Sequence, residues 1–358
     1  MSRPRRRLDG AGQQAEAPVP PALEQSAVEC TIDLAAAGRQ VGRLEIPKST
    51  NTGGWAHQFI PIASFANGDG PTALVMAGNH GDEYEGQVAL LRLIRELRVE
   101  EVHGRVIAIP CLSPEASKAN TRLWPNGVNF NRSFPGRPDG PEHEQLADFL
   151  STVLFPMSDY IVDIHSGGNT GRFIPCSHMH VVDDPVQRKA MLEGMQAWNS
   201  DYHYLYIDVA GTGLLPVEAE RQGKIVITTE LGGGGHVAAS THRLAWSGLT
   251  NVLRHAGILE GEVVRRDEPA IILDGRDPAN YVFAPSSGIF ETLVDPTDPV
   301  TAGELVARIH SLELPEREPE LVHAPVDGVT ACVRAPSRCE QGDNILVFGQ
   351  PIEAADLL

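Results

Sequence analysis

The sequence contains no long apolar run. No stretch approaches the roughly 20 apolar residues that a membrane-spanning helix needs, and the basic residues at positions 3–7 are not followed by an apolar segment. A secretory signal is therefore not expected. Residues 1–27 are rich in Pro, Gln, Ala and Arg, and we expect a mobile tail there. A transit peptide is an alternative that Glu16 and Glu24 disfavour.

Cysteine is scarce, and its spacing is uninformative. The chain has five cysteines, an odd number, and no CxxC pair. This pattern disfavours a disulfide scaffold and a zinc site made of cysteines. We expect a reducing, cytoplasmic setting.

Positive charge is also in short supply. The 29 basic and 47 acidic residues give a net charge of −18. Such a surface repels phosphate backbones and anionic lipid, so nucleic acid and membrane surfaces are not expected partners. A small anionic substrate would need a locally positive pocket, which directs attention to the arginines.

The remaining composition is that of a globular protein, and four short apolar runs predict strands. At 358 residues the chain can form one large domain and a smaller one. The runs, at 72–77, 105–110, 160–164 and 224–229, are rich in Val and Ile, as in strands buried on both faces.

Helical patterns alternate with these strands. One spans 85–97, where Val88, Leu91, Ile94 and Leu97 recur at helical spacing and predict one apolar face. A second spans 142–154. The alternation predicts an α/β domain over residues 28–262, with a mainly parallel, mixed sheet flanked by helices.

From residue 263 to 358 the pattern changes to short strands separated by Gly, Pro and Asp turns. We expect a small, separate β domain here. An Ala-Pro pair recurs at 284–285 and 324–325, each time followed by a glycine three residues later, which indicates two hairpin units closing into a sandwich or barrel. The expected strands are 271–273, 281–283, 289–294, 329–333 and 344–347.

Ionisable residues follow the four buried runs, where ligands bind in open α/β sheets. The run at 72–77 leads to His80 and Glu83, and the run at 160–164 leads to His165. Imidazole and carboxylate are suitable zinc ligands, and a catalytic site needs three of them with one position open. An HxxE pair alone is also common on solvated helix faces. With His165 in a matching position, the sequence predicts one zinc ion per chain.

Glu230 follows the last run and precedes the glycines at 232–235. Zinc lowers the pKa of bound water towards roughly 7, and a nearby carboxylate can accept its proton. We therefore expect Glu230 to be the general base. The alternative is that it caps a loop or pairs with an arginine.

Arg122, Asn131 and Arg132 lie in the segments after the second run and are candidates for holding anions. Guanidinium binds carboxylate through two parallel hydrogen bonds and stays charged. One arginine can bind a substrate carboxylate while another stabilises a developing oxyanion. A surface role is the alternative for any loop arginine.

Taken in order, the motifs GNHGDE, ANTR, NFNRSFPG, DIHSGG and TTELGGGG resemble the succinylglutamate desuccinylase/aspartoacylase family of zinc carboxypeptidase-like enzymes. The resemblance covers roughly residues 40–350. Within the family, GNHGDEYEGQVALL and NRSFPGRPDG are most similar to the N-acetyl-diaminobutyrate deacetylases of ectoine degradation.

The resemblance implies a role for each candidate residue. His80, Glu83 and His165 match the zinc ligands, and Glu230 matches the residue that activates water. Arg122 is similar to the arginine that polarises the scissile carbonyl, and Asn131 and Arg132 to the pair that binds the substrate carboxylate. The C-terminal part is similar to a β barrel-sandwich related to biotinyl and lipoyl carriers. Residues 312–325 contain no lysine, so cofactor attachment is not expected.

The sequence thus predicts a zinc-dependent deacylase of a small N-acyl amino acid. A metallocarboxypeptidase acting on short peptides and a catalytically silent binding protein of the same fold are the alternatives. The acyl group and the amino-acid side chain stay open. His178 and His180 could bind a second metal or line the substrate pocket, but such a pair is more often packed or solvent-facing. Asp163, on the same strand face as His165, could orient a ligand, but backbone hydrogen bonding is the commoner role and it is left out of the site. A homo-oligomer, most often a dimer, is the default assembly.

Overall fold

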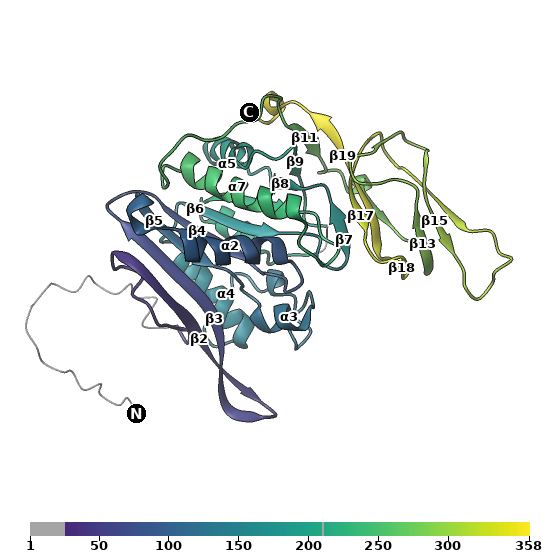
Figure 1. The fold of residues 1–358 in the computed structure, drawn as a ribbon. Coiled ribbons are helices and arrows are strands. Elements are labelled where there is room, and N and C mark those ends of the chain that lie inside the picture. Colours follow the sequence, from purple (N-terminus) through teal and green to yellow (C-terminus); the bar gives the residue numbers. More distant parts are fainter. Residues whose placement is uncertain (1–25, 210) are drawn as a thin grey trace, which may run out of the picture.

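The computed structural model describes residues 26–209 and 211–358, so most of the expected tail at 1–27 lies outside the described residues. Its main feature is a 15-stranded mixed sheet (Figure 1). The strands along its main path are in the order β1-β2-β3-β5-β4-β6-β10-β8-β9-β11-β19-β17-β14. The α/β class with a mixed sheet is therefore confirmed.

The four predicted apolar runs form the centre of this sheet. They are β4 (Thr72–Ala77), β5 (Gly104–Ile109), β6 (Tyr160–His165) and β10 (Ile225–Glu230). These strands are neighbours in the order β5-β4-β6-β10, and each pair is parallel. Their side chains are almost all buried because helices cover both faces. Their carboxyl ends consequently meet at one edge of the sheet.

Three helices cover one face and two cover the other. On the first face lie α2 (Tyr84–Glu96), α5 (Pro185–Ala197) and α7 (Ala239–His255), and α7 packs against both α2 and α5. On the second face lie α4 (Glu142–Phe149) and α6 (Leu215–Arg221). The predicted second helical pattern is therefore present, with its last turn, Leu150–Leu154, a π-helix.

The predicted apolar face of α2 is right at its carboxyl end and wrong at its start. Leu97 is buried and Ile94 packs against the same apolar core, but Val88 is 37 % exposed and Leu91 is 45 % exposed. The inward side is instead formed by Leu90 and Leu93 together with small residues, which allow the helix to approach the sheet closely.

The structure also contains an antiparallel hairpin that sequence analysis did not predict. Strands β2 (Gly38–Thr50) and β3 (Gly53–Asn67) pair along their length, and β3 adds to β5 in antiparallel orientation. Figure 1 shows the tip of this hairpin extending away from the rest of the molecule. The remaining elements before residue 262 are β1 (Glu29–Cys30), α3 (Pro114–Ala119), β7 (Gly171–Phe173), β8 (Cys176–Met179) and β9 (Tyr202–Leu205).

The C-terminal segment is rich in strands, as predicted, but most of them do not stand apart from the main sheet. Hydrogen-bonded pairing is continuous from β9 through β11 to β19 and β17, and β7 also pairs with β17. The strands of this segment that join the main sheet are β11 (Ile271–Asp274), β12 (Tyr281–Phe283), β14 (Pro299–Val300), β17 (Gly328–Arg334) and β19 (Asn344–Ile352).

A second, antiparallel sheet of four strands lies beyond them, on the side of the molecule opposite the helices (Figure 1). A separate apolar core joins it to β17 and β19. The division at residues 262 and 263 stays a prediction. The strands of this sheet, in spatial order, are β16 (Glu320–His323), β15 (Leu305–His310), β13 (Gly288–Thr292) and β18 (Arg338–Cys339).

None of the helices in the described ranges has the length and apolarity needed to cross a membrane. All five cysteines are free thiols.

The close approach of α2 to the sheet gives a testable consequence. A Cβ atom at Gly86 would lie 2.6 Å from Cγ2 of Ile164 and 2.8 Å from Cβ of Ala77. We therefore expect Gly86→Val to lower the free energy of unfolding by about 1–3 kcal/mol or more, the usual cost of overpacking. Urea denaturation followed by circular dichroism measures this.

Val88→Ala is the matched control, because it changes an exposed position of the same helix. It should change the free energy of unfolding by no more than about 0.5 kcal/mol. Equal stability of Gly86→Val and the wild type would show that α2 is not packed as described.

Candidate metal centre and substrate cavity

The predicted metal ligands meet at the carboxyl edge of the central strands. His80 lies in the short connection after β4, and Glu83 is the residue immediately before α2. His165 is the last residue of β6. Since β4 and β6 are adjacent and parallel, residues that follow one strand are brought beside the end of the other.

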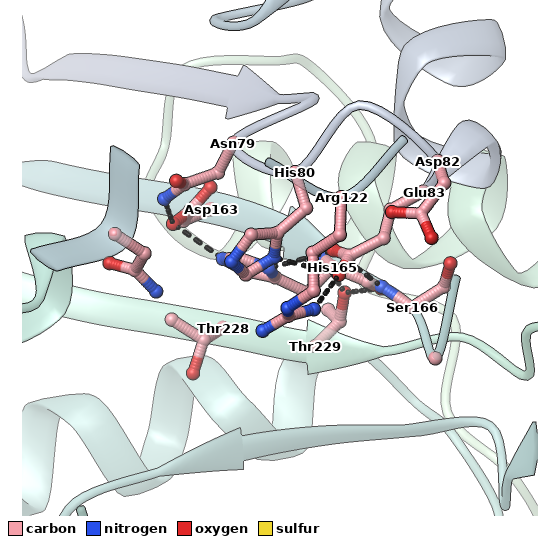
Figure 2. Close-up of polar contacts among 12 residues, drawn as sticks. Asn79, His80, Asp82, Glu83, Arg122, Asp163, His165, Ser166, Thr228 and Thr229 are labelled. Carbon is pink, nitrogen blue, oxygen red and sulfur yellow. Dashed lines mark hydrogen bonds and ion pairs between the residues drawn. The ribbon is translucent and has the colours of Figure 1, made fainter. Parts of the chain in front are cut away.

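The carboxylate of Glu83 lies between the two imidazoles (Figure 2). Nδ1 of His80 is 2.7 Å from its Oε1, and Nδ1 of His165 is 2.8 Å from its Oε2. One nitrogen or oxygen from each residue lies within 4.8 Å of the others, and all three side chains are buried. This group can hold a metal ion.

The outer ring nitrogens are held by oxygen acceptors, which supports this function. Nε2 of His165 lies 2.8 Å from Oδ2 of Asp163, and Nε2 of His80 lies 3.1 Å from Oδ1 of Asn129. An acceptor at Nε2 places the proton there and leaves the Nδ1 lone pair for a metal, as in carboxylate–histidine–zinc triads. Two imidazoles and one carboxylate are also a suitable zinc donor set. The residues therefore fit zinc.

Asp163 and Asn129 were not among the predicted site residues. Leaving Asp163 out of the site in favour of a backbone role was wrong, because its Oδ2 contacts His165, the alternative that was considered, and also accepts a hydrogen bond of 3.1 Å from Nδ2 of Asn79. Its position two residues before His165, on the same strand face, was the available signal. Asn129 offered no comparable signal, because only the folded loop brings it to His80.

The mutual contacts of this group shift its pKa values. Burial alone would raise the pKa of Glu83, but His80 and His165 hold it well below its ordinary value. Burial opposes charge on His165 as well, yet Asp163 and Glu83 raise its pKa well above the ordinary value. Glu83 is therefore an ionised carboxylate, the form that binds a metal.

Glu230 lies beside this group on the neighbouring strand. It is the last residue of β10 and pairs in register with His165 of β6. Its Oε2 is buried and has no hydrogen-bond partner among the described residues. Burial raises the pKa of Glu230 to about 8, and the negative charge of Glu83 adds to the shift. A nearby cation would favour the ionised form.

Arg122, Asn131 and Arg132 are also brought to the site. Nη1 of Arg122 donates to Oε1 of Glu83 at 3.0 Å. Oδ1 of Asn131 accepts from the backbone N–H of Leu215 at 2.8 Å, and Nη1 of Arg132 donates to the backbone oxygen of Asn131 at 2.6 Å. Burial lowers the pKa of Arg132, and the charge of Arg122 adds to this.

A cavity of about 180 Å³ joins these side chains. Six of the seven predicted site residues line it. The seventh, Glu83, does not line the cavity but contacts His80, His165 and Arg122, which do. Tyr281 of β12 and Val347 of β19 complete its wall, so the C-terminal strands contribute to the site. The other lining residues are Phe173, Cys176, His178, Tyr204, Tyr206, Ile207, Asp208, Val209, Leu214, Pro216 and Thr228. A larger hollow of about 810 Å³, beside Arg265 and Arg266, contains none of the predicted site residues.

His180 belongs to a polar network at the margin of the cavity. Its Nδ1 lies 2.9 Å from Oε2 of Glu220, and its Nε2 lies 3.2 Å from Oδ1 of Asp208. Burial opposes its charge, but the hydrogen bonds to Asp208 and Glu220 raise the pKa of His180 to about 9. His180 is therefore an imidazolium at neutral pH and ties the two carboxylates together.

Fold and site together define an α/β protein with a buried His-Glu-His group at the carboxyl edge of its parallel strands. Residues 69–256 match the succinylglutamate desuccinylase/aspartoacylase catalytic domain. The chain belongs to this family, as the ordered motifs of its sequence predicted.

Relatives with assigned names extend the comparison over nearly the whole chain. The N-alpha-acetyl-L-2,4-diaminobutyric acid deacetylase of Halomonas elongata is 41% identical over 330 residues, which cover 92% of this chain and 96% of the relative. The product-bound ectoine utilization protein EutE (DoeB) of Ruegeria pomeroyi has a TM-score of 0.87 at 38% identity, covering 91% of this chain and 99% of that one. A succinylglutamate desuccinylase/aspartoacylase from Rhodobacter sphaeroides has a TM-score of 0.87 at 36% identity, covering 92% and 100%.

The contact between Asp163 and His165 can be tested through metal affinity. Asp163→Asn removes the negative charge that orients the imidazole and increases its basicity. Loss of such a partner typically weakens metal binding about 10–100-fold, and we expect an effect in this range. Competition with a chromogenic zinc chelator measures it on the purified protein.

Asp183→Asn, at an exposed aspartate, serves as the control and should bind zinc as the wild type does. Wild-type zinc affinity in the Asp163→Asn protein would contradict the proposed orienting contact.

The His180 network predicts a dependence of stability on pH. Because the pKa of His180 rises from 6.5 to about 9 on folding, the folded state binds more protons than the unfolded state between these values. Its contribution, at most about 3 kcal/mol, is complete below about pH 6.5 and is lost as the pH rises through about 9.

The difference in free energy of unfolding between the wild type and His180→Gln isolates this contribution from other groups. We expect the difference to be largest at pH 6 and to become small at pH 10. A difference that stays constant over this range would show that His180 is not charged in the folded protein.

Proposed function

We propose that this protein is a zinc-dependent amidohydrolase that cleaves the amide bond of a small N-acyl amino acid. The observation that carries the proposal is the convergence of His80, Glu83 and His165 in one buried group, with the carboxylate of Glu230 on the adjacent strand. Membership of the desuccinylase/aspartoacylase family and 41% identity to a named deacetylase support it.

In this proposal Nδ1 of His80, Nδ1 of His165 and the carboxylate of Glu83 hold one zinc ion per chain. Zinc bound by three protein ligands lowers the pKa of a water molecule towards roughly 7 and polarises a carbonyl group. Asp163 and Asn129 keep the two imidazoles in the required orientation and tautomer.

Glu230 transfers the proton and Arg122 stabilises the developing negative charge in this proposal. Glu230 accepts a proton from the attacking water and passes it to the leaving amine, so one carboxylate serves both steps. The amide C–N bond breaks and the products are a carboxylate and an amino acid. The Arg122 guanidinium, 3.0 Å from Glu83, is placed to stabilise negative charge on the attacked carbonyl oxygen.

Asn131 and Arg132 bind the free carboxylate of the substrate in this proposal. Backbone contacts hold both side chains in place before a substrate arrives, which reduces the entropy lost on binding. Guanidinium is suited to this task because it donates two parallel hydrogen bonds to a carboxylate.

The first substrate to test is N-α-acetyl-L-2,4-diaminobutyrate, on which the Halomonas elongata relative acts according to its name. The five free thiols are consistent with a reducing cytoplasm, which we propose as the compartment. We propose a homo-oligomer as its assembly.

The structure provides arguments against the two alternatives. A carboxypeptidase would need space for a peptide chain, whereas the cavity measures about 180 Å³ and the C-terminal strands form part of its wall. A silent binding protein of this fold would be expected to have lost a ligand or the base. All seven predicted residues are present and adjoin one cavity.

The proposal is tested with zinc-loaded protein and a panel of acetyl amino acids, succinyl amino acids and dipeptides. We expect hydrolysis of acetyl amino acids to exceed that of dipeptides, and a chelator to abolish it until zinc is restored. Glu230→Gln should lower kcat by about 10²–10⁴-fold, the usual contribution of a general base.

Zinc content, measured by atomic absorption, must stay at one per chain in Glu230→Gln, because this residue is not a proposed ligand. Undiminished hydrolysis by a zinc-loaded Glu230→Gln protein would exclude the mechanism. Absence of hydrolysis across the whole panel by the wild type would exclude the function.

A further inference from the structure

One wall of the cavity is built around the ring of Tyr206. The His178 ring lies edge-on to it at 4.5 Å between centroids, and the His180 ring lies against it at 3.9 Å. Nε2 of His180 in turn contacts Asp208. Two separate segments, β8 with the residues after it and the segment after β9, thus form one continuous wall beside the candidate metal centre.

His178 presents an acceptor on this wall. Oγ1 of Thr228 donates its only proton to the backbone oxygen of His178 at 2.8 Å. The same hydroxyl lies 2.9 Å from Nδ1 of His178, so it must accept a hydrogen bond from Nδ1–H there. Nε2 of the neutral ring therefore carries a lone pair. This atom is buried and has no partner among the described residues, although His178 lines the cavity.

Asp208 presents a second acceptor. Its carboxylate lines the cavity with 27% of the side chain exposed, and only Oδ1 is directed to His180. The other side of His180 contacts Glu220, so the imidazolium holds Asp208 in place. Two carboxylates and one imidazolium leave His180, Asp208 and Glu220 with one net negative charge, and Arg132 is near enough for its charge to attract that of Asp208. A carboxylate has about four acceptor positions, so Asp208 can accept further hydrogen bonds from a ligand.

The cavity therefore combines two kinds of polar group. Arg122 and Arg132 offer donors suited to the anionic parts of a substrate. The wall around Tyr206 offers a carboxylate, a lone-pair nitrogen and an aromatic ring, and these groups together are suited to a cation. An anionic side chain placed here would meet the charge of Asp208 and the lone pair of His178.

Resting on the proposed deacylase function, we propose that Asp208 and His178 bind a cationic group on the substrate side chain. The enzyme then selects N-acyl amino acids whose short side chain ends in an ammonium group, against neutral and carboxylate side chains of the same length. His180 and Glu220 are positioning residues that hold Asp208 in place.

The test compares three substrates of equal side-chain length: N-α-acetyl-L-2,4-diaminobutyrate, N-acetyl-L-norvaline and N-acetyl-L-aspartate. For wild-type protein loaded with zinc, kcat/KM should be highest for the ammonium substrate. Asp208→Asn and His178→Phe should each lower the ratio of kcat/KM for the ammonium substrate to that for the norvaline substrate. For Asp208→Asn we expect about a 10–100-fold fall, as for loss of one hydrogen bond to a charged group.

Binding of the free amino acids L-2,4-diaminobutyrate and L-norvaline, measured by calorimetry, separates this inference from the proposed function. If the wild type hydrolyses no substrate but prefers diaminobutyrate, and Asp208→Asn removes that preference, the function fails and the cation site stands. Asp183→Asn is the control and should keep the wild-type ratio. Equal loss on the ammonium and norvaline substrates in Asp208→Asn would overturn the inference, because Asp208 would then act on the arginines or the fold alone.

Discussion

The site depends on one arrangement, a buried carboxylate held between two imidazoles at the carboxyl ends of two adjacent strands. Glu83 can contact His80 and His165 at the same time only because β4 and β6 are adjacent, parallel and in register. Burial of three such polar groups is costly unless each finds a partner. Here the outer nitrogens are satisfied by Asp163 and Asn129, so the group is fixed from both sides before any ligand is present.

The central strands could be predicted because their physical pattern is unambiguous. A strand buried on both faces must be apolar along its length, and the four runs that met this requirement form β4, β5, β6 and β10. The N-terminal hairpin escaped prediction because its long strands carry mixed, partly exposed sequences and its register is set by pairing with β5. Val88 and Leu91 of α2 were wrongly expected to face inward, because Gly86 and Ala89 bring the first turns of the helix close to the sheet, where larger side chains would not fit.

The same distinction applies to the site. His80, Glu83, His165 and Glu230 were predictable because they lie at the carboxyl ends of buried strands or within a few residues of them, where the sheet itself limits their position. Asn129, His178 and Asp208 were not, because they contribute through neighbours that are remote in sequence: Thr228 determines which nitrogen of His178 is free, and Glu220 determines where His180 holds Asp208. The sequence gives the identity of such residues, but only the folded structure gives their hydrogen-bond partners and the direction of each bond.

The pairing of β7 with β17 has a consequence for how the shape of the cavity can be varied. β7 begins six residues after His165, and β17 belongs to the same strand group as Tyr281 and Val347, which face the cavity. The C-terminal strands are thus attached to the rim of the cavity, whereas all seven predicted site residues precede residue 231. A substitution at Tyr281 or Val347 would alter the space beside the His-Glu-His group without touching the group itself.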